Sequence, residues 1–183
     1  MKPTGLGHRL SQGRHHHLRS AQLVRSSLRP AAYAGSRGTP ARLAEHLTAV
    51  AAGHLVQRHG GTWSIQEHAG HLADLDETLF LLRLDDYENG VPILRAADMT
   101  NPGTEAAQHN RRPLAAVLGA CRTNRARLVA RLEGLEGEAF ARVARHPRLQ
   151  CPMRLVDMLF FHAEHDDYHL ARITELRRAA GAI

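Results

Sequence analysis

The stretch MRLVDMLFFHAEHDDYHLARI, residues 153–173, indicates the fold more clearly than any other segment of the chain. Its three histidines and several of its apolar residues recur every three or four residues, which places them on one face of an α-helix. The positions on this face are Leu155, Met158, His162, His165, His169, Ile173 and Leu176. We therefore predict a helix over residues 153–179 that buries three imidazoles in a core-facing stripe, while Asp166 and Asp167 face solvent.

Three further helices are expected upstream, and no segment alternates at period two for long enough to predict a strand. Prolines at the starts of the first and third helices, and a capping-box pattern of Ser64 with Glu67 at the start of the second, mark where they begin. The expected ranges are residues 40–55, 64–87 and 113–132. Residues 89–111 are a long connection, and a helical turn is expected around Phe140. Together these elements predict an all-α, antiparallel four-helix bundle.

Composition and charge fit one domain preceded by a tail. The 183 residues are 43% hydrophobic but only 4% aromatic, which favours helix packing over a β-sandwich. Residues 1–38 contain seven basic residues and no acidic one. The rest of the chain is nearly neutral, although the net charge of the whole chain is +6. We therefore expect a disordered basic tail over residues 1–38 and a bundle domain over residues 39–183.

The same features restrict the partners and the compartment. A polyanion could bind only the tail, whose one aromatic residue is Tyr33, and this argues against nucleic acid as a partner. No apolar run approaches the ~18 residues of a membrane span, so no membrane partner is expected. Cys121 and Cys151 form no CxxC motif, and we interpret them as reduced thiols of a cytoplasmic protein.

Histidines on two helices predict a metal centre. The stripe of the second helix carries His68 and His71, and the last helix carries His165 and His169 four residues apart. An HxxxH pair sets two Cα atoms about 6 Å apart on one face, so that both imidazoles reach one ion. A third histidine from a facing helix leaves a coordination position open, as in catalytic zinc sites. The alternatives are hydrogen-bonded core histidines or a pH-responsive helix contact.

Two motifs together resemble the DinB/YfiT-like superfamily of metal-binding four-helix bundles. WSIQEHAGHLADLD, residues 63–76, resembles the family's start of the second helix, and the His-x-x-x-His-x-x-x-Ile of the last helix resembles its second motif. The matching residues are Trp63, Ser64, Glu67, His71 and Leu72, then His165, His169 and Ile173. The resemblance covers residues 40–179 and implies His71, His165 and His169 as the metal ligands. It makes no demand on His68 or His162, which we interpret as tentative pocket-lining or acid–base groups.

Several other polar residues are candidates for supporting roles. Asp74 and Glu164 are candidates to orient a ligand's second nitrogen, and Glu67 is explained by the capping box alone. Four arginines are candidates to bind a carboxylate of a cosubstrate, although solvated surface positions also explain them. They are Arg83, Arg95, Arg111 and Arg112.

Three classes of function remain open. Three imidazoles suit Zn²⁺ or Ni²⁺, and the resemblance implies either a thiol S-transferase that uses a low-molecular-weight thiol on small electrophiles or a hydrolase of amide or ester-like bonds. Transfer is favoured because a thiol needs less help from a general base, and no carboxylate occupies the histidine stripe of the last helix. The third class is a non-catalytic, stress-associated metal-binding module. A small-molecule substrate and a homodimer are the expected partners.

Overall fold

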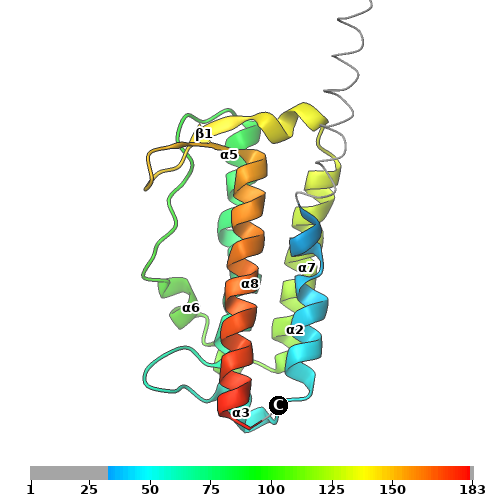
Figure 1. The fold of residues 1–183 in the computed structure, drawn as a ribbon, viewed down its shortest axis with the longest axis vertical. Helices are drawn as coiled ribbons and strands as arrows, with labels where there is room; N and C mark the ends of the chain where they lie inside the picture. The colour runs from blue at the N-terminus through cyan, green and yellow to red at the C-terminus, as the bar shows by residue number, and fades with distance from the viewer. Residues whose placement is uncertain (1–32, 182–183) are drawn as a thin grey trace, which may run out of the picture.

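The computed structural model describes residues 33–181 and shows a helical bundle (Figure 1). The long helices are α2 (Thr39–Thr48), α4 (Ile65–Leu75), α5 (Leu81–Glu88), α7 (Leu114–Glu133) and α8 (Leu155–Ala179). One segment of π-helix, Asp76–Phe80, joins α4 to α5, so that these two form one rod, as the range 64–87 predicted. The short elements are α3 (Ala52–Val56), α6 (Pro102–Ala106), two 3-10 turns (His109–Arg111 and Gly137–Ala141) and the strands β1 (Val143–Arg145) and β2 (Pro152–Arg154).

The folded region begins before the expected boundary at residue 39. Residues 33–37 are already helical, and Tyr33 is buried in the apolar core with Ser36 buried beside it. The segment of the predicted tail over residues 1–32 lies outside the described residues. The first predicted helix, over residues 40–55, is interrupted at residues 49–51, between α2 and α3.

The helices run down, up, up and down in the view of Figure 1, in the order α2, α4–α5, α7 and α8. Contacts between α4–α5 and α7 advance together along both helices: Ala73 with Asn124, Asp76 with Arg125 and Asp85 with Arg131. The expectation of a simple antiparallel bundle is therefore wrong for this pair, which is parallel. The cause is the connection over residues 89–113, which descends the whole length of the bundle before α7 begins (Figure 1).

A two-stranded sheet corrects the expectation that the chain has no strand. β1 and β2 pair antiparallel, with Val143 opposite Arg154 and Arg145 opposite Pro152. Each strand has only three residues, too few for a period-two pattern to show in the sequence. The last helix consequently begins at Leu155 instead of residue 153. The predicted helical turn around Phe140 is confirmed by the 3-10 turn there.

A polar layer divides the core. One apolar cluster gathers around Phe80 and Leu155 at one end of the bundle, and another gathers around Leu72 and Ile173 at the other end. The positions between them on α4–α5 and α8 are occupied by buried acids and histidines, so the polar chemistry lies in the middle of the bundle. Within residues 33–181, no helix is both long enough and apolar enough to cross a membrane.

Candidate metal centre

The first part of the site is the N-terminal half of α4, which a capping box begins as predicted. The Ser64 hydroxyl accepts a hydrogen bond from the Glu67 backbone at 3.2 Å, and the Glu67 carboxylate accepts one from the Ser64 backbone at 2.8 Å. Burial alone would raise the pKa of Glu67, but hydrogen bonds from Arg58 and Ser64 hold that pKa below its usual value. Fixing this helix start sets His68 and His71, both buried, one and two turns into the bundle.

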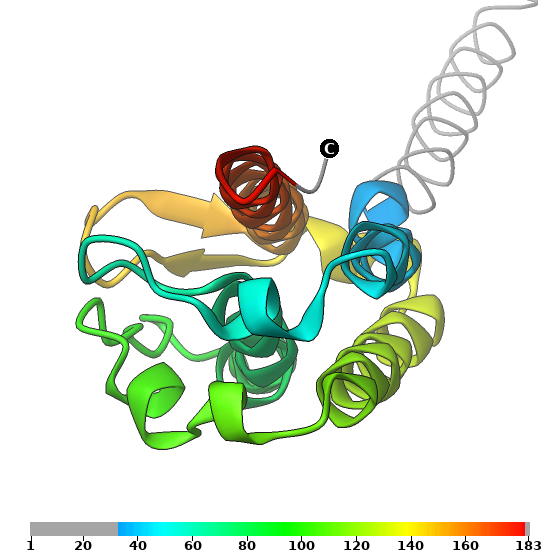
Figure 2. The same cartoon turned by 90° about the horizontal axis from the view of Figure 1, so that it is seen from below.

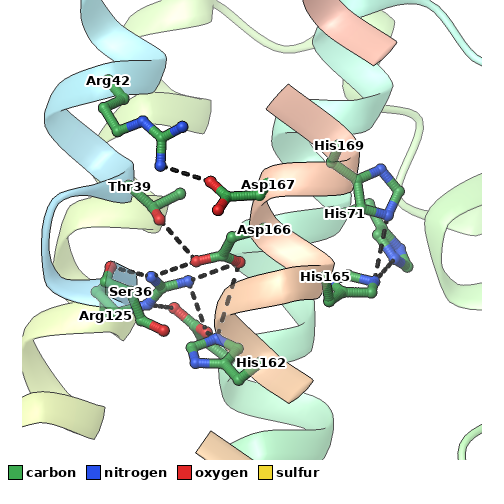
Figure 3. Close-up of polar contacts among 11 residues, drawn as sticks. Ser36, Thr39, Arg42, His71, Arg125, His162, His165, Asp166, Asp167 and His169 are labelled. Atoms are coloured by element: carbon green, nitrogen blue, oxygen red, sulfur yellow. Dashed lines mark hydrogen bonds and ion pairs between the residues drawn. The ribbon is translucent and has the colours of Figure 1, made fainter. Parts of the chain in front are cut away.

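Three imidazoles meet between α4 and α8 (Figure 3). The Nε2 atom of His165 lies 3.3 Å from Nε2 of His71 and 3.2 Å from Nε2 of His169. One ring nitrogen from each of the three histidines lies within 4.8 Å of the others, a spacing that suits one shared ion. The structure thus brings together the three residues that the family resemblance implies as metal ligands.

The outer nitrogens of two of these rings have partners of their own. His71 Nδ1 lies 2.9 Å from the Thr104 hydroxyl, and His169 Nδ1 lies 2.8 Å from Nδ1 of His68. If these Nδ1 atoms carry the protons, the Nε2 lone pairs of His71 and His169 face that of His165. Three converging lone pairs repel one another unless a cation lies between them, so the donor set fits a divalent metal.

The protonation state of the cluster also suits a cation. Burial is the main cause that lowers the pKa of His71 to about 3, of His165 to about 4 and of His169 to about 2, and the neighbouring imidazoles lower those of His71 and His169 further. Burial likewise lowers the pKa of His68 to about 4. All four rings are therefore neutral near pH 7, and neutral imidazole is the form that binds metal.

A cavity of about 780 Å³ opens beside the three imidazoles. Its volume lies within the range typical of small-molecule sites. Trp63 lies against the triad, with its ring 4.7 Å from that of His71, and its Nε1 donates to Glu105 at 3.1 Å. Phe161 and Tyr168 line the same cavity from α8. The rings therefore meet at the wall of a space large enough for a small molecule.

His162 belongs to a different cluster, and this corrects its interpretation as a pocket-lining group. It is buried, does not line the cavity, and its Nε2 lies 2.8 Å from the Asp76 carboxylate. Asp166 is also buried, contrary to the expectation that it faces solvent, and pairs with Arg125 at 2.7 Å (Figure 3). The reason is spacing: Asp166 follows His162 by four residues and so shares its helical face. Asp167 is exposed as expected.

His68 does line the cavity, as expected, but its hydrogen bond to His169 makes it a group that positions a ligand. Neither acid proposed to orient a ligand does so among the described residues. Asp74 accepts a hydrogen bond from His109 at 2.8 Å, and Glu164 is exposed without a bond to the triad. Of the arginines considered for binding a carboxylate, only Arg83 lines the cavity.

Thr104, which contacts His71 from α6, was not predicted, because the connection that holds it carries no periodic pattern. The cluster of Asp76, Arg125 and Asp166 was not predicted either. A signal for this cluster exists: Arg125 follows Cys121 by four residues and precedes Leu128 by three, so it occupies a stripe position of α7.

Comparisons with known proteins show the family of this chain and a similar fold. No curated protein matches the chain. Among solved structures the fold is similar to YfiT from Bacillus subtilis, with a TM-score of 0.70 and 22% identity over 84% of this chain and 87% of that one. YfiT is described as "a probable metal-dependent hydrolase with an unusual four-helix bundle topology", and at this identity the likeness shows the fold alone. The family model of the DinB superfamily matches residues 37–173, most of the folded region, and the chain therefore belongs to the DinB superfamily.

Proposed function

We propose that this chain binds one divalent metal ion, Zn²⁺ or Ni²⁺, through His71, His165 and His169 and catalyses a metal-dependent reaction on a small molecule. The observation that carries the proposal is the convergence of three neutral imidazole nitrogens within 4.8 Å at the wall of a cavity. A bound divalent ion supplies Lewis acidity and lowers the pKa of a coordinated thiol or water.

The residues around the triad have roles that do not depend on which reaction occurs. Thr104 and His68 hold the outer nitrogens of His71 and His169, and so fix the orientation of both rings. Trp63 and Phe161 cover the triad and line the cavity, which reduces contact with bulk water. The triad provides the binding position, and the cavity provides room for a substrate beside it.

Thiol S-transfer is the first candidate reaction. A low-molecular-weight thiol loses its proton, its sulfur bonds to an electrophilic carbon, and a leaving group departs from that carbon. Three neutral ligands leave the charge of a divalent ion uncompensated, which favours an anionic sulfur over a neutral one. No described carboxylate is hydrogen-bonded to the triad, so that charge remains available to the thiol.

Hydrolysis of an amide or ester-like bond is the second candidate, and one observation favours it. Asp74 lines the cavity, and its carboxylate is held at 2.8 Å by the fully buried His109. A general base must lie near the reacting water, and a carboxylate is one of the groups that can serve. Asp74 is the carboxylate of α4 that lines the cavity. The sequence favoured transfer because the histidine stripe of the last helix holds no carboxylate. Asp74 supplies a carboxylate to the cavity from α4 instead.

The test uses protein purified without a nickel column and loaded with Zn²⁺ or Ni²⁺. A chloro-nitroaromatic electrophile is offered with a panel of low-molecular-weight thiols, and a panel of esters and amides is offered without thiol. We expect turnover with one thiol, lost on chelation and in His165→Ala. Turnover of esters or amides without thiol supports hydrolysis instead. Stoichiometric metal with neither activity supports the non-catalytic module, and absence of metal binding overturns the proposal.

His162→Gln is the matched control, because this histidine lies on the same helix but outside the cavity. It should retain metal and turnover per folded molecule. The expected homodimer and cytoplasmic location stay predictions, and sedimentation velocity would measure the first of them.

A further inference from the structure

Arg83 is a buried arginine without a carboxylate partner among residues 33–181. The residue is only 2% exposed. Its Nε and Nη2 atoms both donate to the carbonyl oxygen of Arg95, at 3.2 and 3.1 Å. The nearby carboxylate of Asp86 is engaged by the backbone and guanidinium of Arg95. Burial lowers the pKa of Arg83, which expresses the cost of keeping its charge away from water.

Arg125 shows what this chain does with a buried arginine elsewhere. It is equally buried, at 2% exposed, and it pairs with both Asp76 and Asp166 at 2.7 Å. A buried guanidinium normally has such a partner, because an uncompensated buried charge is strongly destabilising. Arg83 lines the cavity and Arg125 does not, so the partner that Arg83 lacks has space to enter.

His146 adds a second donor at the same end of the cavity. It lies in the turn between β1 and β2, is 7% exposed, and its Nδ1 accepts hydrogen bonds from the backbones of Arg148 at 3.3 Å and Leu149 at 3.0 Å. Burial, then the charges of Arg83 and Arg148, lower its pKa, so the ring is neutral. Its proton must therefore be on Nε2, and no described residue accepts a hydrogen bond from that atom.

Charge along the cavity wall is uneven. Arg83 and Arg148 bring two positive charges to the part of the wall where the neutral His146 lies, and Arg148 forms no ion pair among the described residues. The two acids that line the cavity have partners of their own: Asp74 has His109, and Asp98 accepts from the backbone and hydroxyl of Thr100. The fork geometry of a guanidinium matches a carboxylate or phosphate.

We propose that Arg83, His146 and Arg148 form a binding site for an oxyanion, the carboxylate or phosphate of a small molecule that occupies the cavity. Arg83 follows His71 by twelve residues, which corresponds to about 18 Å along the helix. A ligand that reaches both the triad and this site is therefore an extended molecule with an acidic end. That last step rests on the proposed function, whereas the oxyanion site stands on the contacts of Arg83 and His146.

The first test measures anion binding to metal-free protein, so that it does not depend on the triad. Metal is removed with 1,10-phenanthroline, which carries no carboxylate, and calorimetry follows titration with succinate, inorganic phosphate or the neutral succinamide. We expect succinate or phosphate to bind at least tenfold more tightly than succinamide, and the tighter of the two identifies the class of anion. Absence of anion binding, or equal binding of succinamide, overturns the proposal.

Arg83→Gln removes the charge and keeps a donor for the Arg95 carbonyl, and we expect it to weaken anion binding at least tenfold. Arg127→Gln is the matched control, an exposed arginine of α7 that pairs with Glu77 outside the cavity, and it should bind as the wild type does. If Arg83→Gln does not fold, His146→Asn replaces it, since asparagine can accept the backbone bonds but lacks the Nε2 donor. Unchanged affinity in the folded variant contradicts the proposal.

The second test uses the metal-loaded enzyme and pairs of substrates that differ only in a carboxylate or its amide. We expect Arg83→Gln to reduce the preference for the acid in kcat/KM at least tenfold without changing metal content. An equal preference in both enzymes refutes the extended ligand. If the wild-type protein binds no metal, the proposed function fails, but the anion titration on metal-free protein still decides the oxyanion site.

Discussion

The two sides of α8 place the same residue type in opposite electrostatic surroundings (Figure 3). On one side, His162 contacts Asp76, and the carboxylates of Asp76 and Asp166 are bridged by Arg125. On the other side, the ring nitrogens of His165 and His169 have imidazoles as their hydrogen-bond partners. One cluster contains its own cation, whereas in the other one ring nitrogen from each of His71, His165 and His169 lies within 4.8 Å of the others, a spacing that suits a cation from outside.

The two clusters also differ in the number of helices that they join. The buried cluster of Asp76, Arg125 and Asp166 is called the ionic cluster below. Arg125 also donates to the backbone of Ser36, and Thr39 donates to Asp166 at 2.7 Å. The ionic cluster therefore joins α2, α4–α5, α7 and α8. The triad joins only α4 and α8 and opens to the cavity. Variants of the first cluster should therefore change stability, and variants of the second should change metal binding.

Arg125→Met should have the largest effect. It leaves two buried carboxylates without a cation, and the free energy of unfolding should fall by about 3–5 kcal/mol, measured by urea titration. Arg127→Met, an exposed position of the same helix, should change it by about 0.5 kcal/mol or less. A loss below about 1 kcal/mol in Arg125→Met would show that the cluster does not join the helices as described.

The triad variants should show the opposite behaviour. His71→Ala, His165→Ala and His169→Ala each remove one of three ligands, so the affinity for Zn²⁺ should fall by about 100-fold or more, a loss larger than that from removing an outer partner. Elemental analysis and competition with a chelating dye measure it. His162→Gln should keep the wild-type affinity while losing stability. Equal metal content in the triad variants and the wild type would contradict the assignment.

Thr104→Val tests the support of the triad with a smaller change. Its side chain has the same shape but cannot bond to Nδ1 of His71, which should then turn more freely. We expect the affinity for Zn²⁺ to fall by about tenfold, the low end for an outer partner of a ligand. Thr104→Ser keeps the hydroxyl and should bind metal nearly as well as the wild type. If valine and serine behave alike, the hydroxyl does not orient His71.

The sequence predicted those parts of the molecule that follow helical periodicity. The ranges of the second, third and fourth helices and the capping box at Ser64 agree with the structure, because each depends on local spacing. The triad was identified because the HxxxH pair of the last helix and a histidine of the second helix resemble the motifs of a known family. The parallel pairing of α4–α5 with α7 was missed because the path of a 25-residue connection is set by tertiary contacts.

The errors at the site have a common cause. Periodicity places His162, His165 and Asp166 on one buried face of α8, but that face is wide enough to contact two different neighbours. His162 and Asp166 lie toward the ionic cluster, whereas His165 lies toward α4 and the cavity. Which neighbour each residue meets depends on where α7 and its Arg125 lie, and a pattern within one helix does not contain that information.

The pH dependence of the stability of metal-free protein tests whether the three histidines of the triad are neutral in the folded state. Burial is the main cause that lowers the pKa values of His71, His165 and His169 below the ordinary 6.5 of the unfolded chain. Below pH 6.5 the unfolded chain therefore binds more protons than the folded one, so stability falls as the pH decreases toward about 4 and is unaffected by these groups above 6.5. Replacing His169 with Gln should reduce the slope by up to about 1.4 kcal/mol per pH unit, measured by urea unfolding between pH 7 and pH 5. An unchanged slope would mean that His169 takes up its proton equally in both states, and the distinction between a neutral triad and an ionic cluster would lose its electrostatic basis.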